Sequence, residues 1–287
     1  MSGTARVAVP RVLSVAGSDP SGGAGIQADL KSIAALGGYG MAALTALTAQ
    51  NTRGVRAVHV PPPEFLAAQL AAIGDDIVVD GVKIGMLAGA GPAAVVAGWL
   101  AEHRPPVVVL DPVMVATSGD RLLDPAAEQA VRSLARRAHL VTPNIAELAV
   151  LTGRGPAGTW DEALAQGRRA ARDLGTRVLL KGGHLRSAGA RGPVCRDAVV
   201  APDGTVEAEV VRERVATTAT HGTGCSLSSA LATRAAAGDD WPTALRTATT
   251  WLDGALRAGE ALAVGGGHGP VDHFHHLRPQ AEAADGR

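Results

Sequence analysis

Short apolar runs alternate with longer stretches of helical hydrophobic spacing along most of this chain. Strands that are joined by helices pair in parallel, through right-handed crossovers. The pattern therefore predicts an α/β fold with a doubly wound, mostly parallel central sheet and helices on both faces. The predicted strands are 11–16, 41–50, 55–60, 78–84, 107–110, 139–141, 177–180 and the hairpin 197–200/206–211. The predicted helices are 26–36, 61–73, 91–103, 125–136, 161–174, 225–237 and 242–261.

Composition limits the classes of function. With 287 residues, 46% of them hydrophobic, the chain is long enough for one large core. We expect a single domain at 11–277 between a flexible N-terminal tail (1–10) and a disordered C-terminal tail (278–287). Basic and acidic residues both number 27, which argues against nucleic-acid or membrane partners and favours a small-molecule substrate. Two distant cysteines and the absence of a signal peptide or long apolar run predict a cytoplasmic protein.

A glycine-rich segment, residues 217–226, runs directly into a predicted helix. Gly222 and Gly224 allow the backbone to approach an anion, and the free N–H groups of the helix N-terminus would point at it, with Thr223 between them. Cys225 would then lie in the first turn. There the helix field would lower the thiol pKa and make it a general base or nucleophile. A glycine turn before a buried cysteine explains the segment about equally well.

Two polar features follow predicted strands near the N-terminus. The loop 17–25 is rich in Gly, Ser and Asp, but it lacks both the dinucleotide-binding fingerprint and the P-loop signature. We interpret it as a ligand-contacting loop, with a tight connection as the alternative. Gln50 ends the second strand, at the sheet edge where α/β proteins bind ligands, and its carboxamide could recognise a heteroaromatic ring. It could equally satisfy loop backbone.

Two further features admit both structural and functional interpretations. Asn144 followed by Glu147 matches a helix capping box, which we favour on the sequence alone. The same pair could hold hydrated Mg²⁺ beside nucleotide phosphates. Lys181 precedes two glycines at a strand end and could bring a positive charge to a phosphate, or it could be an ordinary surface lysine.

The remaining segments carry no predicted function. Residues 184–196 are rich in Gly, Arg and Ser, so we expect a mobile loop, and we assign no role to Cys195. The histidine-rich segment 272–276 lacks ligands at metal-site spacing, and we expect a solvated tail there.

Taken together, the motifs of this chain resemble those of the hydroxymethylpyrimidine/phosphomethylpyrimidine kinases of thiamine biosynthesis, in the same order, from about residue 11 to residue 277. The matching segments are 16–31, 48–52, 83–87, 111–114, 142–147, 180–184 and 221–225. The resemblance implies a ribokinase-like fold, ATP and Mg²⁺, and a homodimer. It also implies two successive phosphorylations, which convert 4-amino-5-hydroxymethyl-2-methylpyrimidine to its monophosphate and then to its diphosphate.

The resemblance also implies a role for each matching residue. Cys225 would be the catalytic base, with Lys181 beside it. The implied substrate pocket is formed by Gly17, Asp29, Gln50, Met86 and Val113. The implied ATP and phosphate site is formed by Asp111, Asn144, Lys181, Gly222, Thr223 and Gly224. Asn144 and Glu147 would hold the metal, through water.

Other functions fit the same motifs. Sugar kinases of this fold have an aspartate at the position of Cys225, which argues against a sugar substrate. Pyridoxal kinases are the nearest alternative, because some share the cysteine motif and pyridoxal also presents a hydroxymethyl group. A non-catalytic ligand sensor is a third possibility, but an intact base, lysine and cradle argue against it.

Overall fold

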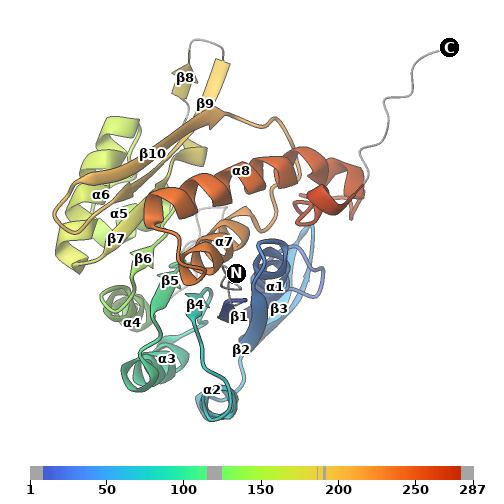
Figure 1. Cartoon of the computed structure of the whole chain (residues 1–287), viewed down its shortest axis with the longest axis vertical. Coiled ribbons are helices and arrows are strands. Elements are labelled where there is room, and N and C mark those ends of the chain that lie inside the picture. The colour runs from blue at the N-terminus through green and yellow to red at the C-terminus, as the bar shows by residue number, and fades with distance from the viewer. Residues whose placement is uncertain (1–8, 115–124, 186, 190–191, 279–287) are drawn as a thin grey trace, which may run out of the picture.

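One sheet forms the centre of the protein. The computed structural model describes residues 9–114, 125–185, 187–189 and 192–278. The strands are β1 (Arg11–Ser18), β2 (Tyr39–Asn51), β3 (Gly54–His59), β4 (Gly81–Ile84), β5 (Val107–Leu110), β6 (Leu140–Val141), β7 (Arg177–Lys181), β8 (Ser187–Gly189), β9 (Gly192–Val200) and β10 (Val206–Glu213). Their order across the sheet is β10-β9-β7-β6-β5-β4-β1-β2-β3, and β8 pairs with β9 (Figure 1).

The six strands from β7 to β2 pair in parallel, as the alternating pattern predicts. Antiparallel strands flank them: β3 pairs with β2, and β9 and β10 extend the sheet beyond β7. Because the central strands run in one direction, their carboxyl ends meet at one edge of the sheet.

Helices cover both faces of the sheet. They are α1 (Gly25–Ala35), α2 (Pro63–Gly74), α3 (Ala90–His103), α4 (Pro125–Ala135), α5 (Ile145–Thr152), α6 (Trp160–Leu174), α7 (Thr223–Ala236) and α8 (Trp241–Gly259). Helices α1, α7 and α8 pack on one face (Figure 1), where Val12 and Val109 point into their cluster. The neighbouring Leu13 and Val108 point to the opposite face, toward α2, α3 and α4. This alternation along single strands buries each strand on both sides.

The structure corrects three predicted segments. The segment 272–276, predicted to be a solvated tail, begins with Asp272 and His273, which are each 3% exposed. The segment 184–196, predicted to be a mobile loop, contains β8 and the first part of β9, residues 192–196, so Cys195 lies in a strand. The predicted helix at 225 begins two residues earlier, at Thr223. Gly224 is therefore in the first turn of α7 rather than before it, and the glycine backbone itself forms the helix N-terminus.

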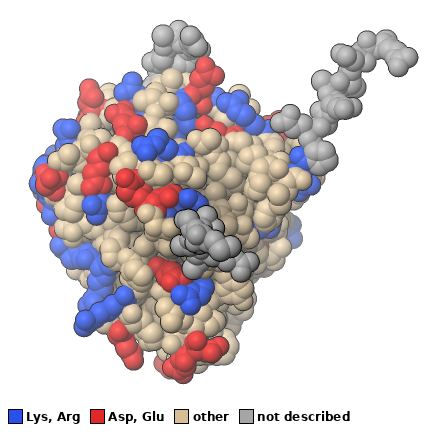
Figure 2. Space-filling view, viewed as in Figure 1, with Lys and Arg blue, Asp and Glu red and all other residues tan. Residues whose placement is uncertain are grey.

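The surface charges, the character of the helices and the chain ends were compared with the predictions. On the face shown in Figure 2, positive and negative side chains are interspersed. None of the helices in the described ranges combines the length and apolar character needed to cross a bilayer. The predicted tails lie mostly outside the described residues, but Arg278 forms an ion pair of 2.7 Å with Asp272.

Candidate active site

The carboxyl ends of the parallel strands bring together polar residues that are far apart in the sequence. Asp111 directly follows β5, Thr142 follows β6, and Lys181 ends β7. The Lys181 Nζ lies 3.0 Å from Asp111 Oδ1, and the Thr142 hydroxyl donates to the same oxygen at 3.0 Å. Lys181 is thus a nearly buried part of this edge, with 15% of its side chain exposed, and not an ordinary surface lysine.

The first turn of α7 meets this ion pair. A Cβ added at Gly224 would lie 3.5 Å from Asp111 Oδ2 and 3.6 Å from Lys181 Nζ. Burial opposes ionisation of Asp111, but Lys181 and Lys83 lower its pKa overall. The structure therefore brings the predicted cradle, Lys181 and Asp111 to one point.

The cradle has the backbone that an anion site needs. Gly222, the N-cap of α7, has φ of 78°, a conformation that favours glycine, and has no side chain to cap the helix. Thr223 turns its hydroxyl back to the Thr220 carbonyl at 2.6 Å. N–H groups of the first turn can therefore face an anion, supported by the positive end of the helix dipole.

The structure contradicts the predicted ionisation of Cys225. Burial raises the pKa of the half-buried thiol to about 11, and Asp29 and Asp111 add to that effect. Lys83 and the backbone N–H of Gly25 act in the opposite direction without overcoming it. The helix field that the sequence suggested is thus outweighed by desolvation and by two carboxylates that are distant in the sequence.

A buried ion pair beneath Cys225 was missed by the sequence analysis. Lys83 Nζ lies 2.7 and 2.8 Å from the two oxygens of Asp29, and both side chains are fully buried. Ser14 and Ser229 also donate to Asp29, at 2.6 and 2.8 Å. The resemblance places Asp29 in the substrate pocket, whereas in the structure its carboxylate is enclosed by these partners. The available signal was a lysine within an apolar strand.

The other residues of the implied pocket are close to the first strands. A Cβ at Gly17 would lie 2.6 Å from Met86 Cε, so the end of the methionine side chain packs directly on Gly17. The Gln50 carboxamide oxygen accepts from the Thr48 hydroxyl at 3.1 Å, and that hydroxyl donates to the Ser18 carbonyl. These contacts place Gln50 beside the end of β1.

Val113 completes the implied pocket residues. It is half-buried, and its N–H donates to the Asp111 carbonyl at 2.9 Å in the loop that follows β5. The structure thus places Val113 next to the Lys181–Asp111 pair. Residues 115–124, which follow in the sequence, lie outside the described part of the chain.

Asn144 and Glu147 form the capping box that the sequence favours. The Asn144 side chain accepts from the Glu147 N–H at 2.9 Å, and Glu147 Oε2 accepts from the Asn144 N–H at 2.8 Å. Glu147 is also electrostatically part of the site. Burial raises its pKa to about 7; Lys181 counteracts this effect, and Asp111 adds to it.

A second pair missed by the sequence analysis joins the two glycine-rich loops. His221 Nε2 lies 2.8 Å from Asp19 Oδ2. Asp19 is 1% exposed and also accepts from the N–H groups of Ser21, Gly23 and Ala24. A Cβ at Gly222 would lie 1.7 Å from the Gly23 carbonyl oxygen, so the loops touch backbone to backbone.

Comparison with known proteins identifies the family. The phosphomethylpyrimidine kinase family model matches residues 19–272. The chain belongs to this family. Hydroxymethylpyrimidine/phosphomethylpyrimidine kinase of Escherichia coli K12 is 46% identical over 268 residues, which cover 92% of this chain and 97% of that protein.

Other relatives extend the comparison. The thiamine biosynthesis multifunctional protein ThiED of Corynebacterium efficiens is 56% identical over 280 residues, which cover 98% of this chain but 37% of ThiED. The chain thus spans little more than a third of that relative. Among solved structures, the ADP complex of Bacillus subtilis pyridoxal kinase has a TM-score of 0.85 at 32% identity, covering 95% of this chain and all of that one. These comparisons confirm the predicted ribokinase-like fold.

The donor set at the carboxyl edge suits a hard cation. Asp111 raises the pKa of Glu147, and both carboxylates raise the pKa of Lys181. Carboxylate and amide oxygens are the ligands that Mg²⁺ prefers. No cluster of three or more His, Cys, Asp and Glu is placed to ligate a metal within the ranges that the structure describes. The donor set therefore fits an ion held partly by water and phosphate.

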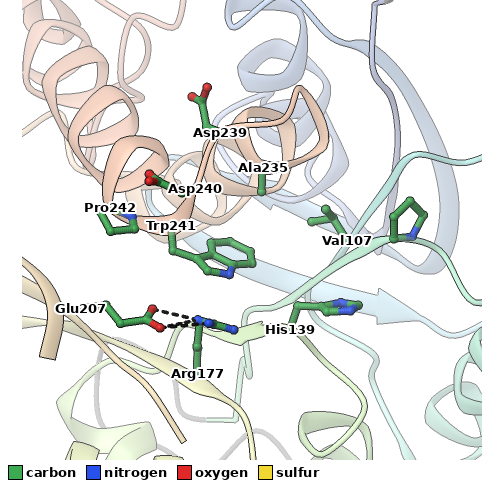
Figure 3. Close-up of a pocket in the computed structure, with 10 residues that line it drawn as sticks. Val107, His139, Arg177, Glu207, Ala235, Asp239, Asp240, Trp241 and Pro242 are labelled. Carbon is green, nitrogen blue, oxygen red and sulfur yellow. Dashed lines mark hydrogen bonds and ion pairs between the residues drawn. The ribbon is translucent and has the colours of Figure 1, made fainter. Parts of the chain in front are cut away.

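A cavity of about 480 Å³ lies at the opposite edge of the sheet, where the strands begin (Figure 3). Its charged groups already have partners: Arg177 Nε lies 2.8 Å from Glu207 Oε2, and the Asp240 carboxylate caps α8 through the Thr243 N–H. None of the predicted site residues lines it. We therefore place the candidate active site at the carboxyl edge.

Proposed function

We propose that this protein is an ATP-dependent kinase of thiamine biosynthesis. Its substrate is 4-amino-5-hydroxymethyl-2-methylpyrimidine, which it converts to the monophosphate and then to the diphosphate. The observation that carries the proposal is the meeting of Lys181 and Gly224 next to Cys225, in a chain of the phosphomethylpyrimidine kinase family. The name of the E. coli relative supports the pyrimidine substrate, and the ADP bound to B. subtilis pyridoxal kinase supports ATP as the phosphoryl donor.

The arrangement suits phosphoryl transfer. This reaction requires in-line positioning and stabilisation of the transferring group more than covalent chemistry. The N–H groups of the cradle at Gly222 and Gly224 would bind the transferring phosphate, and Lys181 would add a positive charge. The Thr223 N–H instead donates to the Thr220 carbonyl at 3.3 Å. Asp111 would orient Lys181 through their 3.0 Å ion pair.

Cys225 would accept the hydroxymethyl proton. Because its pKa is about 11, the thiol is largely protonated at neutral pH in the free protein. In a loose transition state the alcohol keeps its proton until the bond to the leaving group is largely broken. A base that accepts the proton only at that stage is therefore enough for the reaction. Turnover should therefore rise with pH above 7 as the thiolate fraction increases, without a plateau near pH 8.

Asn144 and Glu147 would hold Mg²⁺ through water, beside the nucleotide phosphates. The ion supplies charge neutralisation to those phosphates when bound. The Glu147 carboxyl, whose pKa is about 7, would release its proton on metal binding, because a cation favours the charged form.

We also expect a cytoplasmic homodimer without nucleic-acid or membrane partners. The edge strand β3 supports self-association, since all its residues are exposed and Val55 and Val58 are 54% and 51% accessible. An exposed apolar edge is a surface that proteins usually cover. Analytical ultracentrifugation would check this expectation, and a monomer at micromolar concentration would contradict it.

Gln50 provides the test of substrate identity. An aminopyrimidine presents a ring nitrogen beside an exocyclic amino group, and one carboxamide can donate to the first and accept from the second. Pyridoxal lacks that adjacent pair. Thr48 holds the Gln50 carbonyl, which would pre-orient the amide at the end of β1.

We expect Gln50→Leu to lower kcat/KM for the pyrimidine about tenfold or more, through loss of a buried hydrogen-bonding pair. Turnover of pyridoxal should stay level or improve. Steady-state assays with the pyrimidine alcohol, its monophosphate, pyridoxal and ribose would measure this. A wild-type enzyme that prefers pyridoxal would favour the pyridoxal kinase alternative, and absence of ATP consumption with any substrate would favour the sensor.

A further inference from the structure

The end of the β2–β3 hairpin extends past the strand that supports it. β1 pairs with β2 as far as Ser18 and Leu47, and the Thr48 hydroxyl donates to the Ser18 carbonyl at 2.8 Å. Beyond this point Gln50 pairs across the hairpin with Val55, on the exposed strand β3. The position of Gln50 relative to the cradle therefore depends on what else holds the end of the hairpin.

A glycine-rich segment near the C-terminus packs against that end. We call residues 264–270, which come after α8 and are red in Figure 1, the glycine segment. The His268 N–H donates to the Thr52 carbonyl at 3.0 Å, and the Gly267 N–H donates to the Thr52 hydroxyl at 3.2 Å. Two hydrogen bonds thus join the glycine segment to the first residue of the hairpin turn.

This contact leaves no space for a side chain at Gly267. A Cβ added there would overlap the Thr52 carbonyl oxygen and would lie 2.5 Å from the Thr52 carbonyl carbon. Both atoms belong to the backbone, so no change of rotamer could relieve the overlap. A Cβ at Gly269, in contrast, would have its nearest neighbours, in Ala219, at 3.8 Å. The close approach is therefore specific to Gly267.

The other end of the glycine segment contacts the cradle. The His221 N–H donates to the Gly269 carbonyl at 3.0 Å, and His221 forms a parallel β-bridge with Pro270. His221 directly precedes Gly222, the N-cap of α7. The contacts to the hairpin and the contacts to the cradle therefore come from consecutive residues of one short segment.

The two residues after Val271 anchor the glycine segment to the helices behind the cradle. The Asp272 N–H donates to the Ala255 carbonyl of α8 at 2.9 Å. His273 Nε2 lies 2.9 Å from the Ser226 hydroxyl of α7. Asp272 and His273 are each 3% exposed. The glycine segment thus starts from a fixed position on α7 and α8, and it can hold the hairpin at a fixed position relative to the cradle.

We propose that Gly267 is a positioning residue for substrate recognition: by letting the glycine segment touch Thr52, it holds Gln50 at a set distance from the cradle. The proposal rests on the proposed function, in which Gln50 binds the pyrimidine ring and the cradle binds the transferring phosphate. The hydroxymethyl oxygen has to lie in line with that phosphate, and a displacement of about 1 Å can cost up to about 10²-fold in rate. A segment that contacts both binding elements sets this alignment.

Two substitutions within the glycine segment test this role. Gly267→Ala forces the glycine segment and the hairpin apart, whereas Gly269→Ala adds the same methyl group where there is room for it. Neither glycine has a positive φ, so alanine causes no backbone strain at either position. The measurements are kcat and KM for the pyrimidine alcohol and for ATP, together with amide hydrogen exchange of residues 47–60.

We expect Gly267→Ala to lower kcat/KM for the pyrimidine alcohol about tenfold, a loss similar to that for Gln50→Leu. In a Gln50→Leu background the same substitution should cost less than about twofold, because its effect depends on the Gln50 carboxamide. KM for ATP should stay within about twofold of wild type, and Gly269→Ala should match wild type throughout. Amide exchange of the hairpin should become faster only in Gly267→Ala.

Thr52→Val covers the case in which Gly267→Ala does not fold. Valine has a similar shape to threonine but lacks the hydroxyl that accepts from the Gly267 N–H. Loss of one neutral hydrogen bond should lower kcat/KM for the pyrimidine alcohol about threefold, again only when Gln50 is present. Circular dichroism and Tm check the fold of each variant.

The outcomes distinguish this proposal from the proposed function. Equal losses in the two glycine variants, or a loss in Gly267→Ala that persists in full in the Gln50→Leu background, would overturn the positioning role. Unchanged kinetics in Gly267→Ala, or in Thr52→Val if the glycine variant does not fold, would overturn it as well.

A wild-type enzyme that does not phosphorylate the pyrimidine would instead refute the proposed function. Hydrogen exchange would then decide the role of Gly267 alone. Faster exchange of the hairpin only in Gly267→Ala would support its role in holding the hairpin, and equal exchange in Gly267→Ala and Gly269→Ala would overturn that role.

Discussion

The two edges of the central sheet differ in how their charges are compensated. At the amino edge, around the 480 Å³ cavity, the guanidinium of Arg177 binds Glu207 with two nitrogens and Arg234 binds Asp239 at 2.9 Å. At the carboxyl edge, Asp111 and Glu147 are each 3% exposed and compete for Lys181. One edge has paired charges at its surface, and the other has buried charge with too few counterions.

The difference in charge compensation indicates that the candidate active site is at the carboxyl edge, whereas the cavity lies at the amino edge. Burying charge without full pairing costs free energy, and active sites are where proteins retain such arrangements. The glycines support the same conclusion, since at the carboxyl edge Gly17 lies close to a side chain and Gly222 lies close to backbone. If the carboxyl edge is the active site, substitutions there should lower turnover, and substitutions at the amino edge should not.

The largest effect is expected at Cys225. We predict that Cys225→Ala lowers kcat by about 10²–10⁴, the usual range for a positioned proton-transfer group, while Tm and nucleotide affinity change little. Steady-state kinetics and calorimetric titration with ADP would measure this. Cys195→Ser, in the same fold but far from the cradle in sequence, should keep wild-type turnover. An alanine enzyme with wild-type turnover would end the general-base proposal.

Next in size is the loss of the ammonium group at Lys181. We predict that Lys181→Met lowers kcat/KM for ATP by about 10²-fold, comparable to loss of one preorganised charge-stabilising group. Stability should fall modestly, because Asp111 loses its partner and its pKa then rises. The control is Lys31→Met, since Lys31 binds the Gly22 carbonyl and not the site carboxylates. Equal losses in both variants would show that Lys181 is structural.

Much of the fold, and the position of two charged residues at the carboxyl edge, could be predicted from the sequence. The alternation of strand and helix patterns gave the parallel sheet, and strand ends 107–110 and 177–180 correctly placed Asp111 and Lys181 at one edge. Strand β8 and the first part of β9, residues 192–196, were missed because a Gly-, Arg- and Ser-rich segment lacks the apolar alternation of a core strand, whereas the rest of β9 was predicted as the strand 197–200. The Asn144–Glu147 box was recognised because both partners are local.

What the sequence could not show is burial by distant residues. The pKa of Cys225 depends on Asp29, Lys83 and Asp111, which reach it from three other elements. One signal was available: of the 27 basic residues only three are lysines, and two of them, Lys83 and Lys181, lie at the carboxyl edge. In a chain that otherwise uses arginine, a retained lysine indicates a site that needs a compact charge.

The pH dependence of stability measures how much the buried Glu147 carboxylate destabilises the fold. Its pKa is about 7 in the fold against an ordinary value of 4.5, so the folded protein keeps this proton longer than the unfolded chain does. Stability should therefore fall as pH rises from about 4.5 through 7. Glu147→Gln removes this loss, and its carbonyl can still accept from the Asn144 N–H. We predict that this variant is about 1–3 kcal/mol more stable than wild type at pH 8 without Mg²⁺.

The same variant separates the two interpretations of this residue. If Glu147 helps to hold the metal, Glu147→Gln should raise the Mg²⁺ concentration needed for half-maximal turnover. Glu147→Ala would in addition lose the cap and lower Tm. Chemical unfolding at pH 5 and pH 8 and magnesium titrations measure both. An unchanged magnesium requirement in both variants, with a lower Tm only for alanine, would leave the capping box as its sole role.

The smallest effect is expected at the amino edge. Arg177 and Glu207 form a bidentate pair whose side chains are 34% and 23% exposed. Solvent screens such pairs, so the double variant Arg177→Ala/Glu207→Ala should lose only about 0–1 kcal/mol of stability. It lies at the opposite ends of the strands from Lys181, so kcat and KM for ATP and for the pyrimidine should stay within about twofold of wild type. A large loss of turnover with an unchanged Tm would mean that the amino-edge cavity takes part in catalysis, and the contrast between the two edges would then fail.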